Sequence, residues 1–277
     1  MKKLNHNKFI ADMIRFASSA GSPEKIIHQI LQYICENLNS DRAYIFEDNH
    51  DGTFDNTYEF CSEGVSAEID NLKGVPYEGL LDVWFTEYEK FHNIIIYDVE
   101  EYRKVSEAVY QILKPQGVTS LVTGPIEIGG KYVGFYGVDN PPADIIENIS
   151  LLIDMMEFVI SMMLRLRDYL KEMEELAVTD PLTECKNRMA LEWAYRGSYD
   201  TSQTISVIMC DLNGLKKVND SYGHEAGDKY ICDSAEVLTS CFGKENVYRI
   251  GGDEFTVIIL GETEEYIQKK MKKAKDV

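Results

Sequence analysis

The sequence has no long uncharged apolar segment. Its most apolar stretch, residues 149–166, contains Asp154, Glu157 and Arg165, whereas a membrane-spanning helix needs about 20 predominantly apolar residues. Residues 1–7 contain two lysines and no apolar core, so we do not expect a secretory signal. The pattern therefore predicts a protein with no membrane partner.

Cysteine is sparse and without a pattern. The six cysteines form no C-x-x-C pair and have no regular spacing, which indicates neither a disulfide framework nor a metal site. Disulfides form in oxidising compartments, so unpatterned thiols favour a cytoplasmic protein.

Basic residues are scarce. The chain has 28 Lys+Arg against 47 Asp+Glu, a net charge of −19. Such a balance repels a phosphate backbone, so no nucleic-acid partner is expected. A small polyphosphate can still bind if a divalent cation bridges it to carboxylates.

A length of 277 residues predicts two domains. Apolar residues at helical spacing predict helices near residues 9–17 and 26–38, and strand-like runs alternate with turns after them. Helices flanking an antiparallel sheet give an α+β fold. The strand-like runs are residues 43–46, 57–61, 94–97, 121–128 and 131–138, the last two forming a hairpin around Gly129-Gly130.

A long helix follows the sheet. From Leu152 its apolar residues recur at alternating steps of four and three, the 3.5-residue period of a coiled coil. This favours a seam shared by two chains, although a helix packed only on its own domain stays open. Asp180-Pro181 ends the helix. The predicted seam is Leu152, Met156, Val159, Met163, Leu166, Leu170, Met173 and Ala177.

Residues 205–210 are apolar and short, which predicts a central buried strand. The run ends at Asp211, and a turn with Gly214 and Lys216 follows. A carboxylate at the end of a strand, next to a glycine turn and a lysine, can hold a cation and phosphate oxygens together.

Two further β-rich runs surround Gly251-Gly252-Asp253-Glu254, which predicts a hairpin with two carboxylates at its apex. Taken alone, this is most often an ordinary solvated turn. If the hairpin pairs beside residues 205–210, Asp253 lies near Asp211. Two adjacent carboxylates are costly unless a divalent cation lies between them.

Taken together, these segments resemble the GGDEF family of diguanylate cyclases. The resemblance rests on D-L-N-G-L-K-K-V-N-D-S-Y-G-H-E-A-G-D from Asp211 to Asp228 and on R-I-G-G-D-E-F from Arg249. D-x-L-T-x-x-x-N-R, beginning at Asp180, extends it. It implies a nucleotide-cyclase-like α/β palm domain that condenses two GTP into cyclic di-GMP and pyrophosphate, with one GTP per subunit of a homodimer.

The resemblance also implies a role for individual residues. Asn219 and Asp228 would hydrogen-bond guanine, whose N1–H and amino group suit a carboxylate acceptor. The catalytic group would be Asp253, Glu254 and Lys216, the last at the terminal phosphate. Two Mg²⁺ per GTP would be held by Asp211, the Leu212 carbonyl and Asp253, while the backbone at Gly214, Leu215, Gly251 and Gly252 would approach the substrate.

The N-terminal half resembles GAF domains in D-R-A-Y-I-F from Asp41 and in the hairpin sequence from Ser120 to Asp139. This implies a GAF-like sensor domain over residues 1–150, with a possible unidentified ligand. A coiled-coil signalling helix over 151–178 would mediate the homodimer, and 179–277 would be a partial GGDEF domain.

The sequence departs from the GGDEF pattern in four respects, one of which is Leu215 in place of the family's usual phenylalanine. Glu184 stands where the family usually has glycine, and Phe242 replaces the arginine of its product-inhibition motif. The chain also stops within an apparent helix, so we expect an incomplete palm domain. A catalytically impaired GTP–Mg²⁺-binding module and a dimeric small-molecule sensor therefore remain alternatives.

Overall fold

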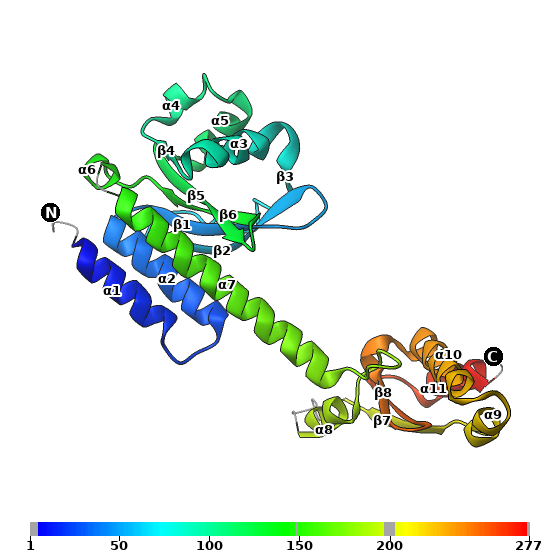
Figure 1. Ribbon diagram of the computed structural model, residues 1–277. Helices are drawn as coiled ribbons and strands as arrows, with labels where there is room; N and C mark the ends of the chain where they lie inside the picture. The colour runs from blue at the N-terminus through cyan, green and yellow to red at the C-terminus, as the bar shows by residue number, and fades with distance from the viewer. Residues whose placement is uncertain (1–4, 148, 197–202, 276–277) are drawn as a thin grey trace. The chain divides into compact units, whose positions relative to one another are not determined.

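The computed structural model describes residues 5–147, 149–196 and 203–275 (Figure 1). It contains two compact units, Met1–Tyr169 and Leu170–Val277, which we call the N-terminal and C-terminal domains. Helix α7 (Ser150–Val178) begins in the first and ends in the second. None of the helices in the described ranges combines the length and apolar character needed to cross a membrane.

The N-terminal domain is built on a six-stranded antiparallel sheet with strand order β3-β2-β1-β6-β5-β4. The predicted hairpin is present: β5 and β6 are joined by Gly129 and Gly130, which have φ of 62° and 78°. The strands are β1 (Arg42–Asp48), β2 (Thr53–Cys61), β3 (Val75–Pro76), β4 (Ile94–Ile96), β5 (Leu121–Ile128) and β6 (Lys131–Asp139).

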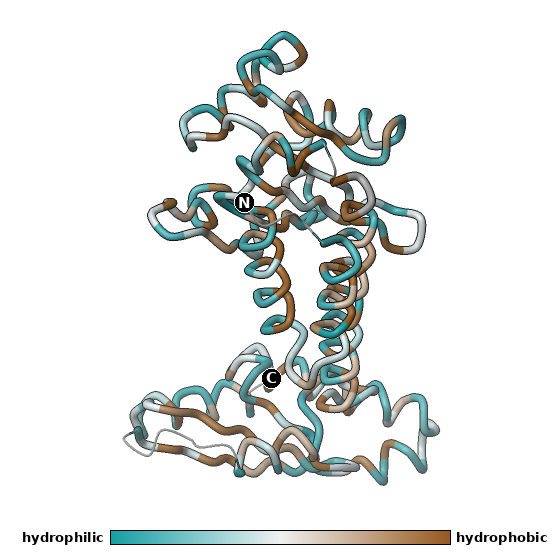
Figure 2. Tube along the Cα trace, turned by 90° about the vertical axis from the view of Figure 1, so that its left-hand side faces the viewer, coloured by the Kyte–Doolittle hydropathy of each residue, from teal (hydrophilic) through white to brown (hydrophobic). Residues whose placement is uncertain are grey.

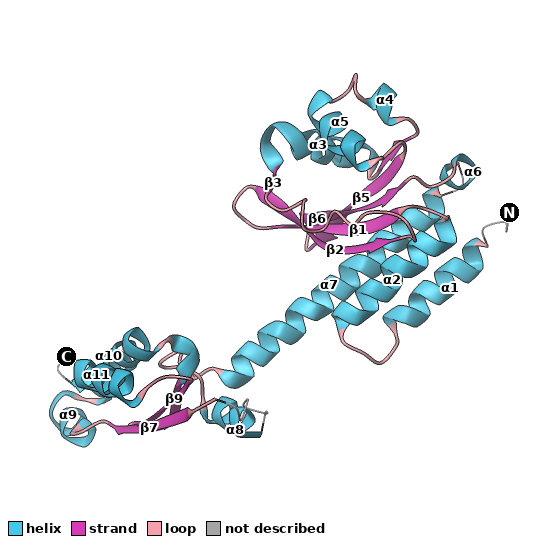
Figure 3. Cartoon of the chain, turned by 180° about the vertical axis from the view of Figure 1, so that it is seen from behind, coloured by secondary structure: helices cyan, strands magenta, loops and turns pink. Residues whose placement is uncertain are grey.

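Helices cover both faces of this sheet, which confirms the predicted α+β layers (Figures 1 and 3). Successive β1 residues point to opposite faces. Ala43 and Ile45 pack in one core with α1, α2 and α7, while Tyr44 and Phe46 pack in the other with α3 and α5. The helices are α1 (His6–Ala17), α2 (Pro23–Leu38), η1 (Tyr77–Leu81), α3 (Asp82–Phe91), α4 (Val99–Tyr102), α5 (Glu107–Leu113), η2 (Lys114–Gln116) and α6 (Ala143–Ile146).

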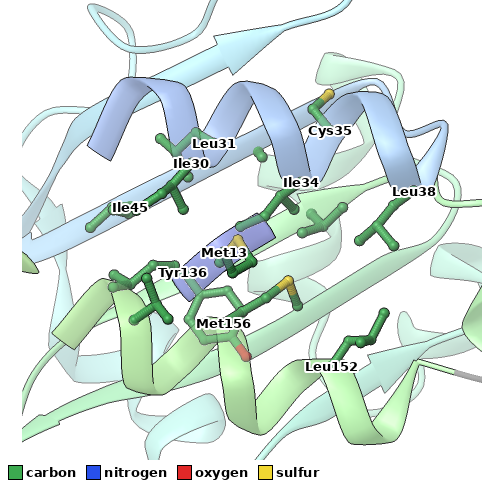
Figure 4. Close-up of a cluster of buried hydrophobic side chains, with 14 of the residues drawn as sticks. Met13, Ile30, Leu31, Ile34, Cys35, Leu38, Ile45, Tyr136, Leu152 and Met156 are labelled. Carbon is green, nitrogen blue, oxygen red and sulfur yellow. The ribbon is translucent and has the colours of Figure 1, made fainter. Parts of the chain in front are cut away.

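Helix α7 contributes much of the first core, shown in Figure 4. Leu152, Met156, Val159 and Met163 are at most 1% exposed there. This half of the predicted seam therefore packs against its own domain and does not face a second chain. The sequence could not show this, because packing on a sheet and packing on a partner helix both require an apolar stripe.

The C-terminal domain has a three-stranded antiparallel sheet of order β7-β9-β8. Helices α10 and α11 cover one face and α8 contacts the other. The elements are α8 (Arg188–Arg196), β7 (Ile205–Asp211), α9 (Leu215–Tyr222), α10 (His224–Phe242), η3 (Lys244–Asn246), β8 (Val247–Gly251), β9 (Glu254–Leu260) and α11 (Glu264–Lys275).

Strand β7 corrects one prediction. We predicted a central buried strand, but in the described sheet β7 pairs only with β9 and lies at the edge. Ile208 faces the helices and is 8% exposed, whereas Val207 and Met209 on the other face are 47% and 86% exposed. The prediction was wrong because apolar composition does not reveal how many neighbours a strand has.

Candidate functional site

The end of β7 and the turn of the β8–β9 hairpin meet at one end of the sheet. Asp211 is paired with Glu254 across the β7–β9 ladder, and the Leu212 amide donates to the Asp253 carbonyl over 3.1 Å. The hairpin thus pairs beside residues 205–210, which is the condition under which Asp253 was expected near Asp211. These contacts bring the carboxylate-bearing residues Asp211, Asp253 and Glu254 to one place.

The hairpin turn depends on two glycines. Gly251 and Gly252 have φ of 154° and 55°, values that residues with a Cβ rarely adopt. The Arg249 guanidinium holds this turn, because its Nε and Nη2 donate to the Gly252 carbonyl over 3.2 and 3.0 Å. Arg249 Nη1 donates to Asp180 Oδ1 over 2.9 Å. The arginine therefore ties the hairpin to the D-x-L-T segment.

Asp180 is the acceptor at the centre of that segment. It also accepts from the Thr183 amide and hydroxyl over 2.9 and 2.8 Å. Burial acts to raise the pKa of Asp180, but the bonds from Arg249 and Thr183 outweigh it and lower the pKa. Sequence reasoning assigned no role to Arg249, although it begins the R-I-G-G-D-E-F motif and is a basic residue within an otherwise apolar strand.

Asn219 lies beside the first turn of α10. A Cβ at Gly227 would lie 1.9 Å from Asn219 Oδ1, so only glycine allows this contact. The Gly223 amide donates to the Asn219 carbonyl over 2.9 Å and fixes the turn between α9 and α10. Asp228 follows Gly227 and is exposed. The fold thus places Asn219 next to the residue that precedes Asp228.

The loop after Asp211 leads directly into α9. Gly214 has φ of 85° and precedes Leu215, the first residue of the helix, and no side chain caps this N-terminus. Free amides at a helix N-terminus are suited to phosphate oxygens. Lys216 is exposed in the same turn. The Tyr230 hydroxyl donates to the Asn213 carbonyl over 3.3 Å and connects the loop to α10.

A groove of about 730 Å³ begins at this loop. It is lined by Asp211, Leu212 and Asn213 and by residues of α10 and α11, including Tyr230 and Lys275. Asn219, Asp228 and the hairpin carboxylates are not part of its lining. Of the residues assigned to the metal, Asp211 and Leu212 line this groove, whereas Asp253 and the residues assigned to the base do not.

The donor groups fit magnesium better than a metal held entirely by protein. Within the described ranges no three His, Cys, Asp or Glu side chains are grouped to bind an ion. The available donors are the Asp211 and Asp253 carboxylates with the Leu212 carbonyl. Mg²⁺ is commonly bound by one or two carboxylates and completes its shell with water and substrate phosphates.

The family model of the diguanylate cyclase GGDEF domain matches residues 177–277. This region is a GGDEF domain. Diguanylate cyclase DgcS of Shewanella oneidensis is 34% identical over 96 residues, which cover 33% of this chain and 32% of that protein. A diguanylate cyclase of Vibrio cholerae is 24% identical over 235 residues, covering 80% of this chain and 65% of that protein. The chain thus spans less than two thirds of either relative.

Solved structures are similar to each half of the chain. The coiled coil and GGDEF domain of DgcB from Caulobacter crescentus, in complex with c-di-GMP, is 28% identical and has a TM-score of 0.37, covering 40% of this chain and 60% of that one. A phycoerythrobilin-bound GAF domain from a cyanobacterial phytochrome is 18% identical with a TM-score of 0.47, covering 58% and 96%.

One departure from the GGDEF pattern has a visible structural cost. Glu184 has φ of 55°, the left-handed conformation that costs a residue with a Cβ roughly 1–2 kcal/mol. Glycine, the usual residue of the family at this position, avoids that cost. The turn is nevertheless kept, because the Glu184 amide donates to the Asp180 carbonyl over 2.8 Å.

Proposed function

We propose that the C-terminal domain condenses two GTP molecules into cyclic di-GMP and pyrophosphate. The observation that carries this proposal is the pairing of Asp211 with Glu254, together with the Leu212–Asp253 bond, inside a GGDEF domain. The names of the relatives from Shewanella and Vibrio support the same activity. We place the enzyme in the cytoplasm, where its substrate is made.

Magnesium would be held by the Asp211 and Asp253 carboxylates and the Leu212 carbonyl, with two ions per GTP. When bound, the ions would neutralise phosphate charge and make the attacking hydroxyl more acidic. The amides at Gly214 and Leu215 bind phosphate oxygens, and Lys216 neutralises the terminal phosphate. The Gly251-Gly252 backbone lets the substrate approach closely, and Glu254 positions ribose or a metal ligand.

Guanine is selected by Asn219 and Asp228. The Asp228 carboxylate accepts from the N1–H and the amino group of guanine, while the Asn219 amide provides both a donor and an acceptor. Adenine has no N1–H, so it leaves the Asp228 carboxylate without the donor that guanine provides. A site that requires a hydrogen bond rejects an analogue that lacks it far more strongly than an apolar pocket does.

In the chemical step, the 3′-oxygen of one GTP bonds to the α-phosphorus of the other. The bond from that phosphorus to the bridging oxygen breaks, and pyrophosphate leaves. Asp253 accepts the proton of the hydroxyl. In a second condensation, the 3′-oxygen of the other nucleotide bonds to the remaining α-phosphorus and a second pyrophosphate leaves, which closes the ring. Two GTP-loaded domains must therefore face each other in a homodimer.

The N-terminal domain would act as the sensor that controls this dimer. The core that packs with α3 and α5 contains an apolar cavity of about 40 Å³, lined by Phe46, Trp84 and Phe135 among others. This cavity is a candidate place for a small ligand. The next residue of β1, Glu47, lies on the opposite face and binds Arg167 of α7 over 2.9 and 2.5 Å. A ligand that shifts Phe46 in the cavity would therefore also shift its neighbour Glu47, and with it the contact to Arg167 of α7.

Calorimetric titration of the intact chain tests the proposal. GTP with Mg²⁺ should bind more tightly than ATP, EDTA should abolish binding, and Asp228→Ala should weaken it. Glu236→Ala, also exposed on α10, is the matched control and should bind normally. Equal affinity for ATP and GTP would contradict the guanine assignment.

Chromatography of the same samples measures cyclic di-GMP. Product formation supports the cyclase. GTP binding without product would instead favour a GTP–Mg²⁺-binding regulatory module. The observation behind that second candidate is the outer edge of β7, which has no neighbour among the described strands.

A further inference from the structure

A series of buried hydrogen bonds crosses the sheet of the N-terminal domain. The Tyr88 hydroxyl of α3 lies 2.7 Å from the Thr123 hydroxyl of β5, which donates to the Tyr136 carbonyl of β6 over 2.6 Å. The Tyr136 hydroxyl donates in turn to the Ile153 carbonyl of α7 over 3.0 Å. Tyr88, Thr123 and Tyr136 are at most 1% exposed. We call these three bonds the hydroxyl chain.

The donors of the hydroxyl chain all point the same way. The Thr123 hydroxyl has a single proton, and this proton is used in the bond to the Tyr136 carbonyl. The Tyr88 hydroxyl must therefore donate to Thr123 Oγ1, because two hydroxyl oxygens at 2.7 Å share a proton. Each hydroxyl thus donates in the direction from α3 to α7. Removing one of them leaves a buried neighbour with one partner fewer, which is unfavourable.

Tyr136 carries the hydroxyl chain from one face of the sheet to the other. Its carbonyl accepts the bond from β5, while its ring packs in the core that contains α7, where Figure 4 shows it beside Met156. Gly124, its partner across the β5–β6 ladder, leaves room for the ring. A Cβ at Gly124 would lie 2.6 Å from the Tyr136 hydroxyl oxygen, so a side chain there would displace the group that binds α7.

The hydroxyl chain runs through apolar surroundings. Tyr88 packs in the core with α3 and α5, and Tyr136 packs in the core with α1, α2 and α7. Figure 2 shows that hydrophobic residues recur along the strands and helices of the chain. A polar group that loses its partner in such a core is strongly disfavoured. The bonds therefore hold α3, β5, β6 and α7 in one arrangement.

Helix α3 also contributes to the apolar cavity of this domain. Trp84 lines the cavity, and Tyr88 follows it by four residues, which places both on the same side of the helix. A ligand that displaces Trp84 therefore displaces the first donor of the hydroxyl chain as well. This path is separate from the contact of Glu47 with Arg167, which lies about four turns further along α7.

We propose that the hydroxyl chain couples the position of α3 to the first turns of α7. While the chain is intact, Tyr136 holds the Ile153 carbonyl and keeps α7 in one position on the sheet. A movement of α3 withdraws the Tyr88 donor, and the hold on α7 weakens through Thr123 and Tyr136. The coupling rests on the proposed sensor role for its purpose, but it is a property of the N-terminal domain alone.

Hydrogen exchange of the full-length chain without nucleotide, followed by mass spectrometry, tests the coupling. Tyr88→Phe and Thr123→Val each remove one hydroxyl, and neither residue belongs to the core cluster around α7. Both variants should nevertheless accelerate exchange of the amides of residues 153–157 by roughly fivefold, the effect of one lost buried hydrogen bond. Tyr110→Phe is the matched control. It removes a hydroxyl of the same core, bonded to Glu100 over 3.0 Å, and should leave α7 unchanged.

Two comparisons separate coupling from general destabilisation. Helix α2 is the internal reference, because it packs in the same core as α7 and makes none of the bonds of the hydroxyl chain. Tyr136→Phe alone should accelerate exchange in α7, and adding Tyr88→Phe should change it by less than twofold, since the connection is already broken. Unchanged exchange in α7, equal acceleration of α2 and α7, or fully multiplicative effects of the two tyrosines would overturn the inference.

The result is independent of the cyclase activity. Faster exchange in α7 of a chain that forms no cyclic di-GMP would contradict the proposed function and leave the coupling in place. An active cyclase in which Tyr88→Phe and Thr123→Val leave α7 exchange unchanged would contradict the coupling alone.

Discussion

Arg249 shows how a single side chain organises the GGDEF domain. Its guanidinium spans the Gly252 carbonyl and the Asp180 carboxylate, two groups that no strand pairing connects. The hairpin bearing Asp253 and the turn after α7 are thereby fixed to each other. Asp180 and Arg249 are both largely buried, at 17% and 11% side-chain exposure, so this ion pair is only weakly screened by solvent.

Asp180→Asn tests the contribution of this pair to stability. The pKa of Asp180 in the folded, unsubstituted chain is lowered. The ionised carboxylate therefore stabilises the fold at pH values above its unfolded pKa of about 3.9. This contribution is lost as the pH falls through the folded pKa. The variant should lose about 2 kcal/mol of unfolding free energy at pH 7, and the difference from the unsubstituted chain should shrink below about pH 4.

Denaturant unfolding at pH 7 and at lower pH measures this difference. Asp220→Asn, at an exposed position on α9, is the control and should leave stability nearly unchanged at both values. A difference that stays constant down to acidic pH would show that the Asp180 charge does not contribute.

Helix α7 joins the two domains, and its packing changes along its length. The last buried residue, Leu164, is 1% exposed. One turn later, the Arg167 guanidinium donates to both carboxylate oxygens of Glu47 and, over 3.2 Å, to the Tyr58 hydroxyl. These bonds raise the pKa of Arg167, so it stays charged. Beyond this point the side chains of residues 168–176 are exposed, so this stretch of the helix is the place where its rotation can be controlled.

Insertions after Leu170 test that control without removing the Arg167–Glu47 contact. Seven added residues restore the heptad register, whereas two rotate the following helix by about 200°. The seven-residue variant should retain most of the rate of cyclic di-GMP formation. In the two-residue variant this rate should fall by roughly fivefold or more. If both variants dimerise and synthesise product like the unsubstituted chain, α7 serves only as a tether.

The elements also show where sequence reasoning is sufficient. The hairpins at Gly129-Gly130 and at Gly251-Gly252 could be predicted, because turn residues and alternating patterns are local signals. The pairing of Asp211 with Glu254 could not, because strand pairing between distant segments has no local signal. The edge position of β7 and the burial of Met156 could not, since the same apolar residues suit several partners. The Arg249–Asp180 pair joins residues 69 positions apart, and nothing local to either one predicts it.

At the scale of the whole molecule, the two compact domains have separate hydrophobic cores. The core clusters of the described chain never combine residues from both domains. Domains with independent cores commonly unfold in separate transitions. A ligand that binds one domain should therefore stabilise that domain selectively.

Differential scanning calorimetry of the intact chain tests this independence. GTP with Mg²⁺ at 100 times its dissociation constant should stabilise one transition by about 2.7 kcal/mol and leave the other in place. EDTA should remove the shift, and Asp228→Ala should reduce it. A shift of both transitions by the same amount would instead show that the domains unfold as one unit.

The exposed face of β7 has a consequence for the handling of this protein. An edge strand with an unpaired backbone and apolar side chains is a template for adding further strands. Ile205, Val207 and Met209 stand on one face of such a strand, and Met209 is 86% exposed. Without a covering segment, this surface favours aggregation at high concentration and recognition by chaperones in the cell. Within the described residues, the strand that leads to the candidate metal ligand Asp211 is therefore also a surface that lowers solubility.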